Sequence, residues 1–313
     1  MNSFDDYVRN FRNTINQAGL QVHPAKDIPY GCRMEVSDSA TNVPVTLYYG
    51  KKGFSMVIGG KAGELKNRIE GLFSLAGPQD AVPSEQNAKP YGFEDVEGFE
   101  SGWIGTDESG KGDVFGPLVA AAVAVDMKLV AALEAAGVKD CKQLTDKKVQ
   151  ALAAEIRRLC AGRFRELILL PARYNSLYAS MKSEGKNLNH LLAWAHARVI
   201  EDTLELTPCG FALTDKFADV RFVESKLMAR GRAIVLVQKP YAERNIAVAA
   251  ASVLARDSFL TGLDGLSRRY GLDFPKGAGL LVEKTIRQFV GLHGKAALSE
   301  VGKLHFRTFE GVL

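Results

Sequence analysis

The stretch from residue 103 to residue 125 constrains the fold more strongly than any other part of the chain. Its first apolar run ends at two adjacent carboxylates, Asp107 and Glu108, a glycine-lysine-glycine turn follows at 110–112, and a longer apolar run begins at Leu118. Two apolar runs around a glycine-rich turn predict a strand, a turn and a second strand. A plain solvent-facing hairpin is the alternative, but such a turn does not need an acidic pair beside a lysine between glycines.

Length and composition limit the class of protein. The chain has 313 residues, of which 46% are apolar and 24% charged, and this suits one large or two ordinary globular domains. No apolar run approaches the roughly 18–20 residues of a membrane span, and the first residues do not resemble a signal peptide. We therefore expect a cytoplasmic protein without a membrane partner. The four cysteines have no short spacing, so neither a disulfide framework nor a zinc site is predicted.

The charges are distributed unevenly along the chain. Residues 1–75 carry nine Lys and Arg against seven Asp and Glu, residues 76–100 carry one against six, and residues 101–313 carry thirty against twenty-three. A basic body on both sides of an acidic connector suits a polyanionic partner such as nucleic acid. Many metabolic enzymes are equally basic, so charge alone does not decide between the two.

The first 76 residues predict a small α+β domain. An amphipathic helix ends near Gly19, three short strands follow at Cys32–Val36, Val43–Tyr49 and Phe54–Ile58, and a second helix carries its apolar side at 65–73. Lysines near the strand turns are candidates for phosphate contacts or for a solvated rim: Lys51, Lys52 and Lys61. Residues 77–100 are rich in proline and acidic residues and predict an interdomain linker.

Residues 101–313 predict an α/β domain with a mixed sheet, because strand and helix signals alternate after the opening motif. The predicted strands are 164–170, 211–214 and 233–237, and the predicted helices are 128–136, 145–160, 172–181, 187–206 and 244–260.

Four acidic residues fall where strand ends or helix starts can turn them toward one point. Asp107 and Glu108 end the first strand, Asp215 ends a later one, and Glu243 begins the most apolar helix. Clustered carboxylates repel one another unless cations neutralise them. Hard divalent ions with oxygen ligands, Mg²⁺ or Mn²⁺, are the natural choice, and a pair of them supports in-line phosphodiester hydrolysis.

Nucleotide hydrolysis is a competing interpretation of the same turn. Gly105, Gly110 and Lys111 fit the first seven positions of a phosphate-binding P-loop, but the eighth is Gly112 and not the serine or threonine that holds Mg²⁺. Two carboxylates inside a loop meant to surround phosphates also argue against this function. No dinucleotide-binding or nucleophile-elbow motif occurs.

The stretch 107–119, DESGKGDVFGPLV, closely resembles the signature of the type 2 ribonucleases H, and its Gly-Lys-Gly and Phe-Gly-Pro elements are similar to the ribonuclease HIII branch. The resemblance covers about residues 101–310, with shorter matching segments at 139–145, 174–175, 187–189, 214–217, 249–257 and 303–306. At 239–243 the family's usual Lys-Ala-Glu is replaced by Tyr-Ala-Glu.

The resemblance implies a fold, an activity and a set of ligands. The fold is a ribonuclease H-like mixed sheet flanked by helices. An N-terminal domain, whose fold resembles that of the TATA-box-binding protein, holds the substrate. The activity is endonucleolytic cleavage of the RNA strand of RNA/DNA hybrids with Mg²⁺ or Mn²⁺, leaving 5′-phosphate and 3′-hydroxyl ends. The implied catalytic and metal-binding residues are Asp107, Glu108, Asp215 and Glu243. Asp257 is the runner-up for the fourth position, and a surface pair with Arg256 is its alternative role.

Substrate contacts are expected around the glycine-rich turn. Glycines let the backbone approach a ribose, whose 2′-hydroxyl distinguishes RNA from DNA. The predicted substrate-binding residues are Ser109, Gly110, Lys111, Gly112, Lys142 and Asn187, although helix capping explains Asn187 equally well. The histidines at 190, 196 and 305 are interpreted as packing or surface residues. Two alternatives stay open, a hybrid-binding protein without activity and a metal-dependent nuclease for another nucleic acid. We expect a monomer.

Overall fold

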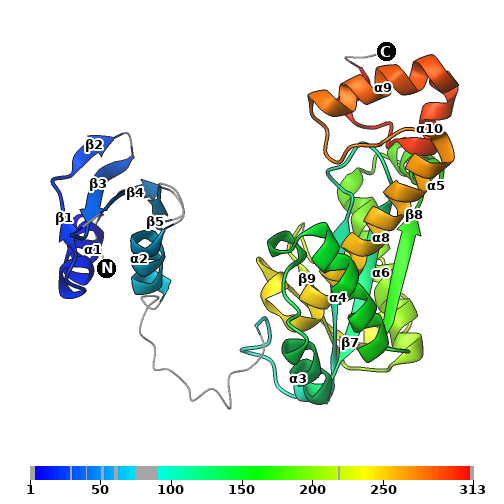
Figure 1. The fold of residues 1–313 in the computed structure, drawn as a ribbon. Helices are drawn as coiled ribbons and strands as arrows, with labels where there is room; N and C mark the ends of the chain where they lie inside the picture. Colours follow the sequence, from blue (N-terminus) through cyan, green and yellow to red (C-terminus); the bar gives the residue numbers. More distant parts are fainter. Residues whose placement is uncertain are drawn as a thin grey trace. The chain divides into compact units, whose positions relative to one another are not determined.

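The computed structural model describes residues 4–28, 30–39, 41–50, 53–59, 63–74, 91–217 and 219–310. The chain divides into two compact units, residues 1–88 and residues 89–313 (Figure 1). The lysines predicted near the N-terminal turns, Lys51, Lys52 and Lys61, lie outside the described residues, as do residues 77–90 of the predicted linker.

The N-terminal unit is a five-stranded antiparallel sheet with two helices. The strand order is β1-β3-β4-β5, and β2 also pairs with β3. The elements are α1 (Phe4–Gln17), β1 (Gln21–Val22), β2 (Lys26–Ile28), β3 (Gly31–Ser37), β4 (Asn42–Gly50), β5 (Gly53–Ile58) and α2 (Glu64–Ser74). The predicted three-strand core is confirmed, and the two short strands β1 and β2 were not predicted.

Both helices of this unit pack on one face of the sheet. Ile15 of α1 and Ile69 of α2 are buried together with Met34, Val45 and Leu47, which alternate along β3 and β4. Because side chains of a strand point alternately to its two faces, the positions between them form the opposite face, which neither of the two described helices covers. The similarity of this unit to the TATA-box-binding protein stays a prediction.

The C-terminal unit, residues 89–313, is built on a second five-stranded sheet with the order β10-β9-β6-β7-β8. Strands β10, β9 and β6 are parallel, and β7 runs antiparallel to both of its neighbours. The strands are β6 (Trp103–Ser109), β7 (Leu118–Val125), β8 (Phe164–Leu169), β9 (Phe211–Asp215) and β10 (Val235–Lys239). The helices are α3 (Met127–Ala135), α4 (Asp146–Leu159), α5 (Pro171–Ser183), α6 (Leu188–Leu206), α7 (Arg221–Glu224), α8 (Ile246–Tyr270), α9 (Leu280–His293) and α10 (Leu298–Val301).

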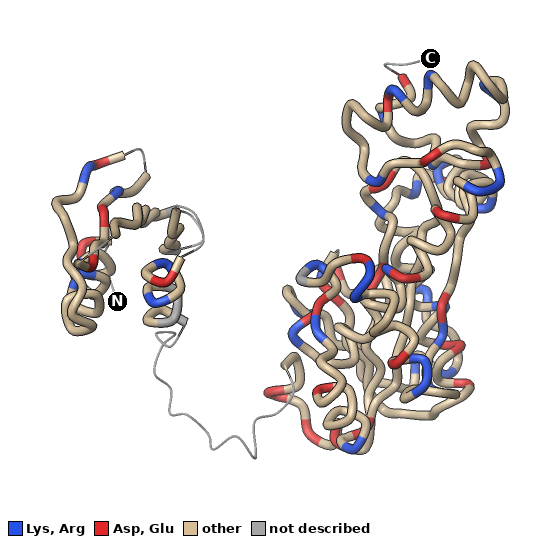
Figure 2. The backbone as a smooth tube through the Cα atoms, in the orientation of Figure 1, with Lys and Arg blue, Asp and Glu red and all other residues tan. Residues whose placement is uncertain are grey.

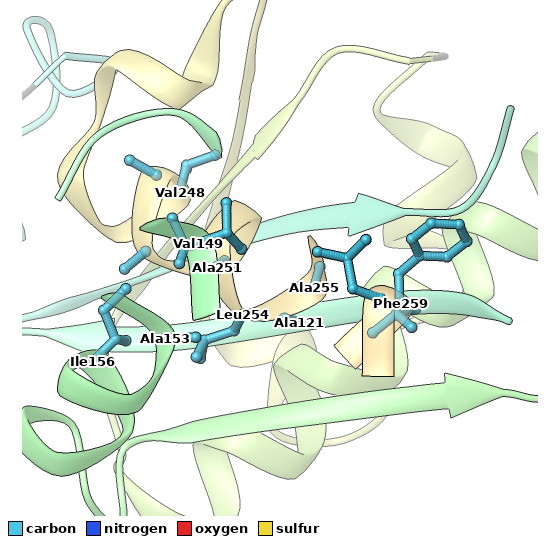
Figure 3. Close-up of a cluster of buried hydrophobic side chains, with 14 of the residues drawn as sticks. Ala121, Val149, Ala153, Ile156, Val248, Ala251, Leu254, Ala255 and Phe259 are labelled. Carbon is cyan, nitrogen blue, oxygen red and sulfur yellow. The ribbon is translucent and has the colours of Figure 1, made fainter. Parts of the chain in front are cut away.

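The sheet of the C-terminal unit is covered on both faces, which explains the unbroken apolar run of β7. All eight residues of β7 are buried. Alternate residues such as Ala121 and Val123 pack toward α4 and α8, and the residues between them, such as Ala120 and Ala122, pack toward α6. Figure 3 shows part of the first layer, formed by Ala121, Val149, Ala153, Ile156, Val248, Ala251, Leu254, Ala255 and Phe259. Small side chains at the contact allow α8 to approach the sheet closely.

Helix α8 is the one described helix long and apolar enough to cross a membrane by length and composition, with a mean hydropathy of 1.4 over its most apolar window. This differs from the prediction that no such segment exists. This window is 78% buried inside the C-terminal unit, as expected of a helix in a protein core. The helix also continues to Tyr270, ten residues beyond the predicted end at residue 260.

The predicted linker is shorter at its C-terminal end than its composition indicated. Residues from 89 onward belong to the C-terminal unit. Phe93 and Phe99 are buried, stack on each other at 5.2 Å between ring centroids, and both contact the ring of Trp103. These aromatic contacts fasten the segment to the start of β6. The four cysteines are free thiols, as expected.

Candidate active site

Two carboxylates lie at the ends of neighbouring parallel strands. Thr106 of β6 pairs with Thr214 of β9, so the next residue of each strand, Asp107 or Asp215, lies at the same edge of the sheet. The carboxyl ends of parallel strands are where α/β sheets form ligand sites. The fold therefore brings together two acidic residues that are far apart in the sequence.

A short turn brings Glu243 to the same edge. Glu243 lies in the 3-10 turn η4 (Ala242–Arg244), directly before α8, whose N-cap is Asn245. The prediction that Glu243 begins the helix is therefore off by one turn. The backbone N–H of Ala242 donates to Oδ1 of Asp215 at 3.4 Å, and this bond ties the turn to the end of β9.

Asp107 is half-buried among negative charges. Burial raises the pKa of Asp107 well above its ordinary value, and the charges of Glu108 and Asp215 raise it further. A hydrogen bond of 2.8 Å from the Glu108 amide and the charge of Lys142 act in the opposite direction. A buried carboxylate beside two others becomes stable in its ionised form when cations are close.

Glu108 has the opposite electrostatic environment. Burial alone would raise its pKa, but a hydrogen bond and charge from His196, together with Lys111, lower the pKa of Glu108 to about 2. The Nε2 atom of His196 lies 3.1 Å from Oε2 of Glu108, and Nζ of Lys111 lies 3.5 Å from Oε1. Glu108 is therefore held ionised, with each carboxylate oxygen facing a different partner.

Lys142 lies between two of the carboxylates. Its Nζ atom is 3.7 Å from Oε1 of Glu243. Partial burial would lower the pKa of Lys142, but the negative charges of Asp140, Glu243 and Asp107 outweigh it and raise the pKa. The prediction that Lys142 belongs to the site is consistent with this position.

The donor set fits a hard divalent cation. Asp107, Glu108, Asp215 and Glu243 offer only carboxylate oxygens, the ligands that Mg²⁺ and Mn²⁺ prefer. In the described part of the chain no three His, Cys, Asp or Glu side chains are close enough together to hold a metal ion. Lysine ammonium groups contact two of these carboxylates instead.

The glycine-rich turn borders a cleft of about 400 Å³, which is lined by Glu108, Ser109, Gly110, Lys111, Gly112, Cys141, Lys142, Leu144, Asp146 and Arg256. Its two glycines differ in their physical reason. Gly110 has a φ of 87°, and a Cβ there would lie 2.2 Å from the carbonyl oxygen of Pro117, so the fold itself requires glycine. A Cβ at Gly112 would meet nothing within 4 Å, so its bare backbone faces open space.

Two predicted residues have other contacts. Asn187 is exposed and caps α6, with its side chain accepting from the Asn189 amide at 3.1 Å. Asp257 is 8% exposed and pairs with Arg157 at 2.6 Å. Its expected partner Arg256 pairs with Asp146 instead. The described contacts of Asp257 involve none of the four carboxylates, and this favours Glu243 as the fourth ligand.

Sequence reasoning missed His196. It was interpreted as a packing residue, yet it contacts Glu108 directly. A signal was present, because Leu192, His196 and Val199 share the buried face of one helix. A histidine on an apolar helix face needs a polar partner inside the protein.

Basic and acidic positions are interspersed over the C-terminal unit (Figure 2). The net positive charge of this unit is therefore not concentrated in one uniform basic face. The cations that line the cleft are Lys111, Lys142 and Arg256.

A mixed five-stranded sheet between helices, with carboxylates at the ends of its parallel strands, defines a ribonuclease H-like α/β protein. A family model described as Ribonuclease HII matches residues 104–309. The chain belongs to the type 2 ribonuclease H family and is similar to its ribonuclease HIII members. It is thus a ribonuclease H enzyme. Because the family model matches within residues 89–313, we call this C-terminal unit the catalytic unit.

Named relatives support this assignment. The ribonuclease HIII of Chlamydia pneumoniae is 43% identical over 213 residues, which are 67% of this chain and 69% of that protein. The ribonuclease HIII of Protochlamydia amoebophila is 40% identical over 210 residues, 67% of this chain and 68% of that protein. Among solved structures, Bst-RNase HIII in complex with Mn²⁺ is 26% identical, with a TM-score of 0.62 over 98% of this chain and 95% of that one.

Proposed function

We propose that this chain is an endonuclease that hydrolyses the RNA strand of RNA/DNA hybrids with two Mg²⁺ or Mn²⁺ ions, leaving 5′-phosphate and 3′-hydroxyl ends. The observation that carries the proposal is the cluster of Asp107, Glu108 and Asp215 at one sheet edge, with Glu243 tied to the same edge. Membership of the ribonuclease H family and the Mn²⁺ complex of Bst-RNase HIII support it.

Each part of the site has a role in the proposal. Bound divalent ions supply a water of lowered pKa and neutralise the charge that develops on the phosphate. The four carboxylates hold these ions. Lys111 and Lys142 contact backbone phosphates, and the open backbone at Gly112 lies close to the 2′-hydroxyl of the ribose. Because these contacts involve backbone and sugar, sequence preference is slight.

The N-terminal unit holds the duplex in this proposal. The face of its sheet that the helices leave free carries Arg33, Thr46, Tyr48 and Ser55, which alternate with the buried positions. The match to Bst-RNase HIII extends over both units. A second contact surface raises the local concentration of substrate at the catalytic unit.

A cleavage assay with three substrates tests the proposal. The full-length protein is incubated with end-labelled RNA/DNA hybrid, DNA duplex and RNA duplex, each with Mg²⁺, with Mn²⁺ and with EDTA. We expect cutting of the RNA strand of the hybrid only, and only with metal. A 3′-hydroxyl product is extended by a polymerase, and a 5′-phosphate product is ligated.

Two outcomes would overturn the proposal. Hybrid binding without cleavage under every metal condition identifies a hybrid-binding protein without activity. Cleavage of the DNA duplex identifies a metal-dependent nuclease for another nucleic acid.

A further inference from the structure

A buried histidine lies beneath the site, between α6 and the sheet. His196 of α6 is 0% exposed. The hydrophobic core cluster between α6 and the sheet includes Ile104, Ala122, Ala193, Ala197 and Ile200, and His196 lies on the helix that supplies the last three. Burying an imidazole among alkyl groups is costly unless its two nitrogens are hydrogen-bonded.

Both nitrogens of His196 have partners, and the ring is fixed from a third side. Nε2 lies 3.1 Å from Oε2 of Glu108, and Nδ1 lies 2.8 Å from Oγ1 of Thr106. The ring stacks on Phe217 with centroids 5.1 Å apart. An ionised carboxylate only accepts, so Nε2 carries the hydrogen and donates to Glu108. Nδ1 accepts from the Thr106 hydroxyl when the ring is neutral and donates to it when the ring is protonated.

Each of these contacts is attached to a strand end that carries a site carboxylate. Thr106 immediately precedes Asp107, Glu108 is itself a site residue, and Phe217 follows Asp215 by two positions. His196 therefore links the end of β6 with the end of β9. Residues that hydrogen-bond to metal-ligating side chains in this way orient those side chains and fix their rotamers.

We propose that His196 is a positioning residue that holds the Glu108 carboxylate in the orientation needed for divalent metal binding. The inference rests on the proposed function only for the role of Glu108 as a ligand. His196 itself contacts neither metal nor substrate, so its removal should affect metal affinity and kcat and leave the KM for hybrid unchanged.

Calorimetric titration of full-length, metal-free protein with Mn²⁺ tests the proposal without using activity. We expect His196→Ala to weaken Mn²⁺ binding by about 10- to 100-fold. In steady-state assays at saturating metal, kcat should fall while KM for the hybrid stays within twofold. His196→Gln, whose amide can still donate to Glu108, should recover part of both losses.

Glu201→Gln is the matched control for a purely structural effect. Glu201 is buried on the same helix, but its Oε1 accepts from the backbone amides of Met228 and Gly231. We expect this variant to lose thermal stability and to keep the Mn²⁺ affinity of the wild type. If His196→Ala behaves as Glu201→Gln does, with lower Tm and unchanged Mn²⁺ affinity, His196 is structural and the proposal is wrong.

Two further measurements keep the proposal testable if His196→Ala does not fold. Thr106→Val removes the shorter of the two hydroxyl contacts to Nδ1, since Thr214 Oγ1 lies 3.5 Å from the same atom. At nearly constant volume, this variant should weaken Mn²⁺ binding in the same direction, by a smaller factor; unchanged affinity would count against the proposal. ¹⁵N NMR of the wild type should show the hydrogen on Nε2, and a hydrogen on Nδ1 alone would overturn it. A wild type that binds no Mn²⁺ and cleaves nothing contradicts the proposed function, whereas normal binding in His196→Ala contradicts only this inference.

Discussion

Among single residues, Asp107 shows most clearly that a group placed for metal binding can lower the stability of the metal-free fold. Its carboxylate is half-buried beside two others, so its pKa is raised well above the ordinary value. A group with a raised acid pKa stabilises the fold only below its unfolded pKa, and the contribution is lost as pH rises. Without metal, ionisation of Asp107 as the pH rises therefore destabilises the catalytic unit.

Asp107→Asn is expected to abolish cleavage and to stabilise the metal-free protein. We expect kcat to fall by at least about 100-fold, with hybrid affinity within several-fold of the wild type. In EDTA the Tm should rise by at least about 2 °C at pH 7, and the gain should shrink below pH 4. Cleavage rates and thermal unfolding check this. Strong residual activity would contradict the assignment of Asp107 as a ligand.

Lys303 is a second buried charge, outside the candidate site. Its Nζ atom donates to the carbonyl oxygens of Phe115, Gly116 and Pro117 at 3.3, 2.6 and 3.4 Å. Burial lowers the pKa of Lys303 to about 7. Between this value and the ordinary value for lysine, the unfolded chain binds the additional proton, so stability rises with pH.

Comparison of the wild type with Lys303→Met should reveal that dependence. The difference in free energy of unfolding between the two proteins should change in favour of the wild type by up to about 1.4 kcal/mol per pH unit above pH 7. Urea unfolding at pH 7.5, 8.5 and 9.5 measures it. Parallel pH curves for the two proteins would show that Lys303 keeps an ordinary pKa.

Among the elements, α8 and β6 depend on each other most directly. A Cβ at Gly105 would lie 2.3 Å from backbone atoms of Ala247 and Val248. Only glycine allows the helix backbone to lie this close to the strand that carries Asp107 and Glu108. The small residues of α8 thus set the distance between the helix and the active-site strand.

Gly105→Ala should therefore destabilise the catalytic unit, whereas Gly265→Ala should not. Overpacking at a backbone contact costs about 1–3 kcal/mol or more. Gly265 lies in the same long helix and has nothing within 4 Å of its ideal Cβ, so alanine there should add about 0.5–1 kcal/mol of stability. Urea unfolding of both variants tests this pair. Equal stabilities would contradict the close approach of α8 to β6.

At the scale of the whole molecule, the two units have separate hydrophobic cores. Removing residues 1–88 should therefore leave a folded catalytic unit. We expect its KM for hybrid to rise at least about tenfold, because one of two contact surfaces is lost, while kcat changes little and activity returns at high enzyme concentration. An unchanged KM would show that the N-terminal unit does not hold the substrate.

Much of the fold was predictable from local signals. Apolar periodicity and N-caps such as Thr145 and Asn187 defined most helices within a few residues. Two short strands, the extension of α8 and the burial of Phe93 and Phe99 were not predicted. These features depend on pairing and packing with distant segments, and such partners leave little local pattern in the sequence.

The sequence by itself determined the chemistry of the site, because the acidic pair beside a glycine-lysine-glycine turn and the family signature around it are local. It also indicated two domains and a mixed sheet. Only the tertiary structure decided which distant groups meet these residues: Asp215 beside Asp107, Lys142 beside Glu243, Arg157 on Asp257 and His196 beneath Glu108. The physical reason is that strand register and helix packing set these distances, and both arise from contacts between segments far apart in the chain.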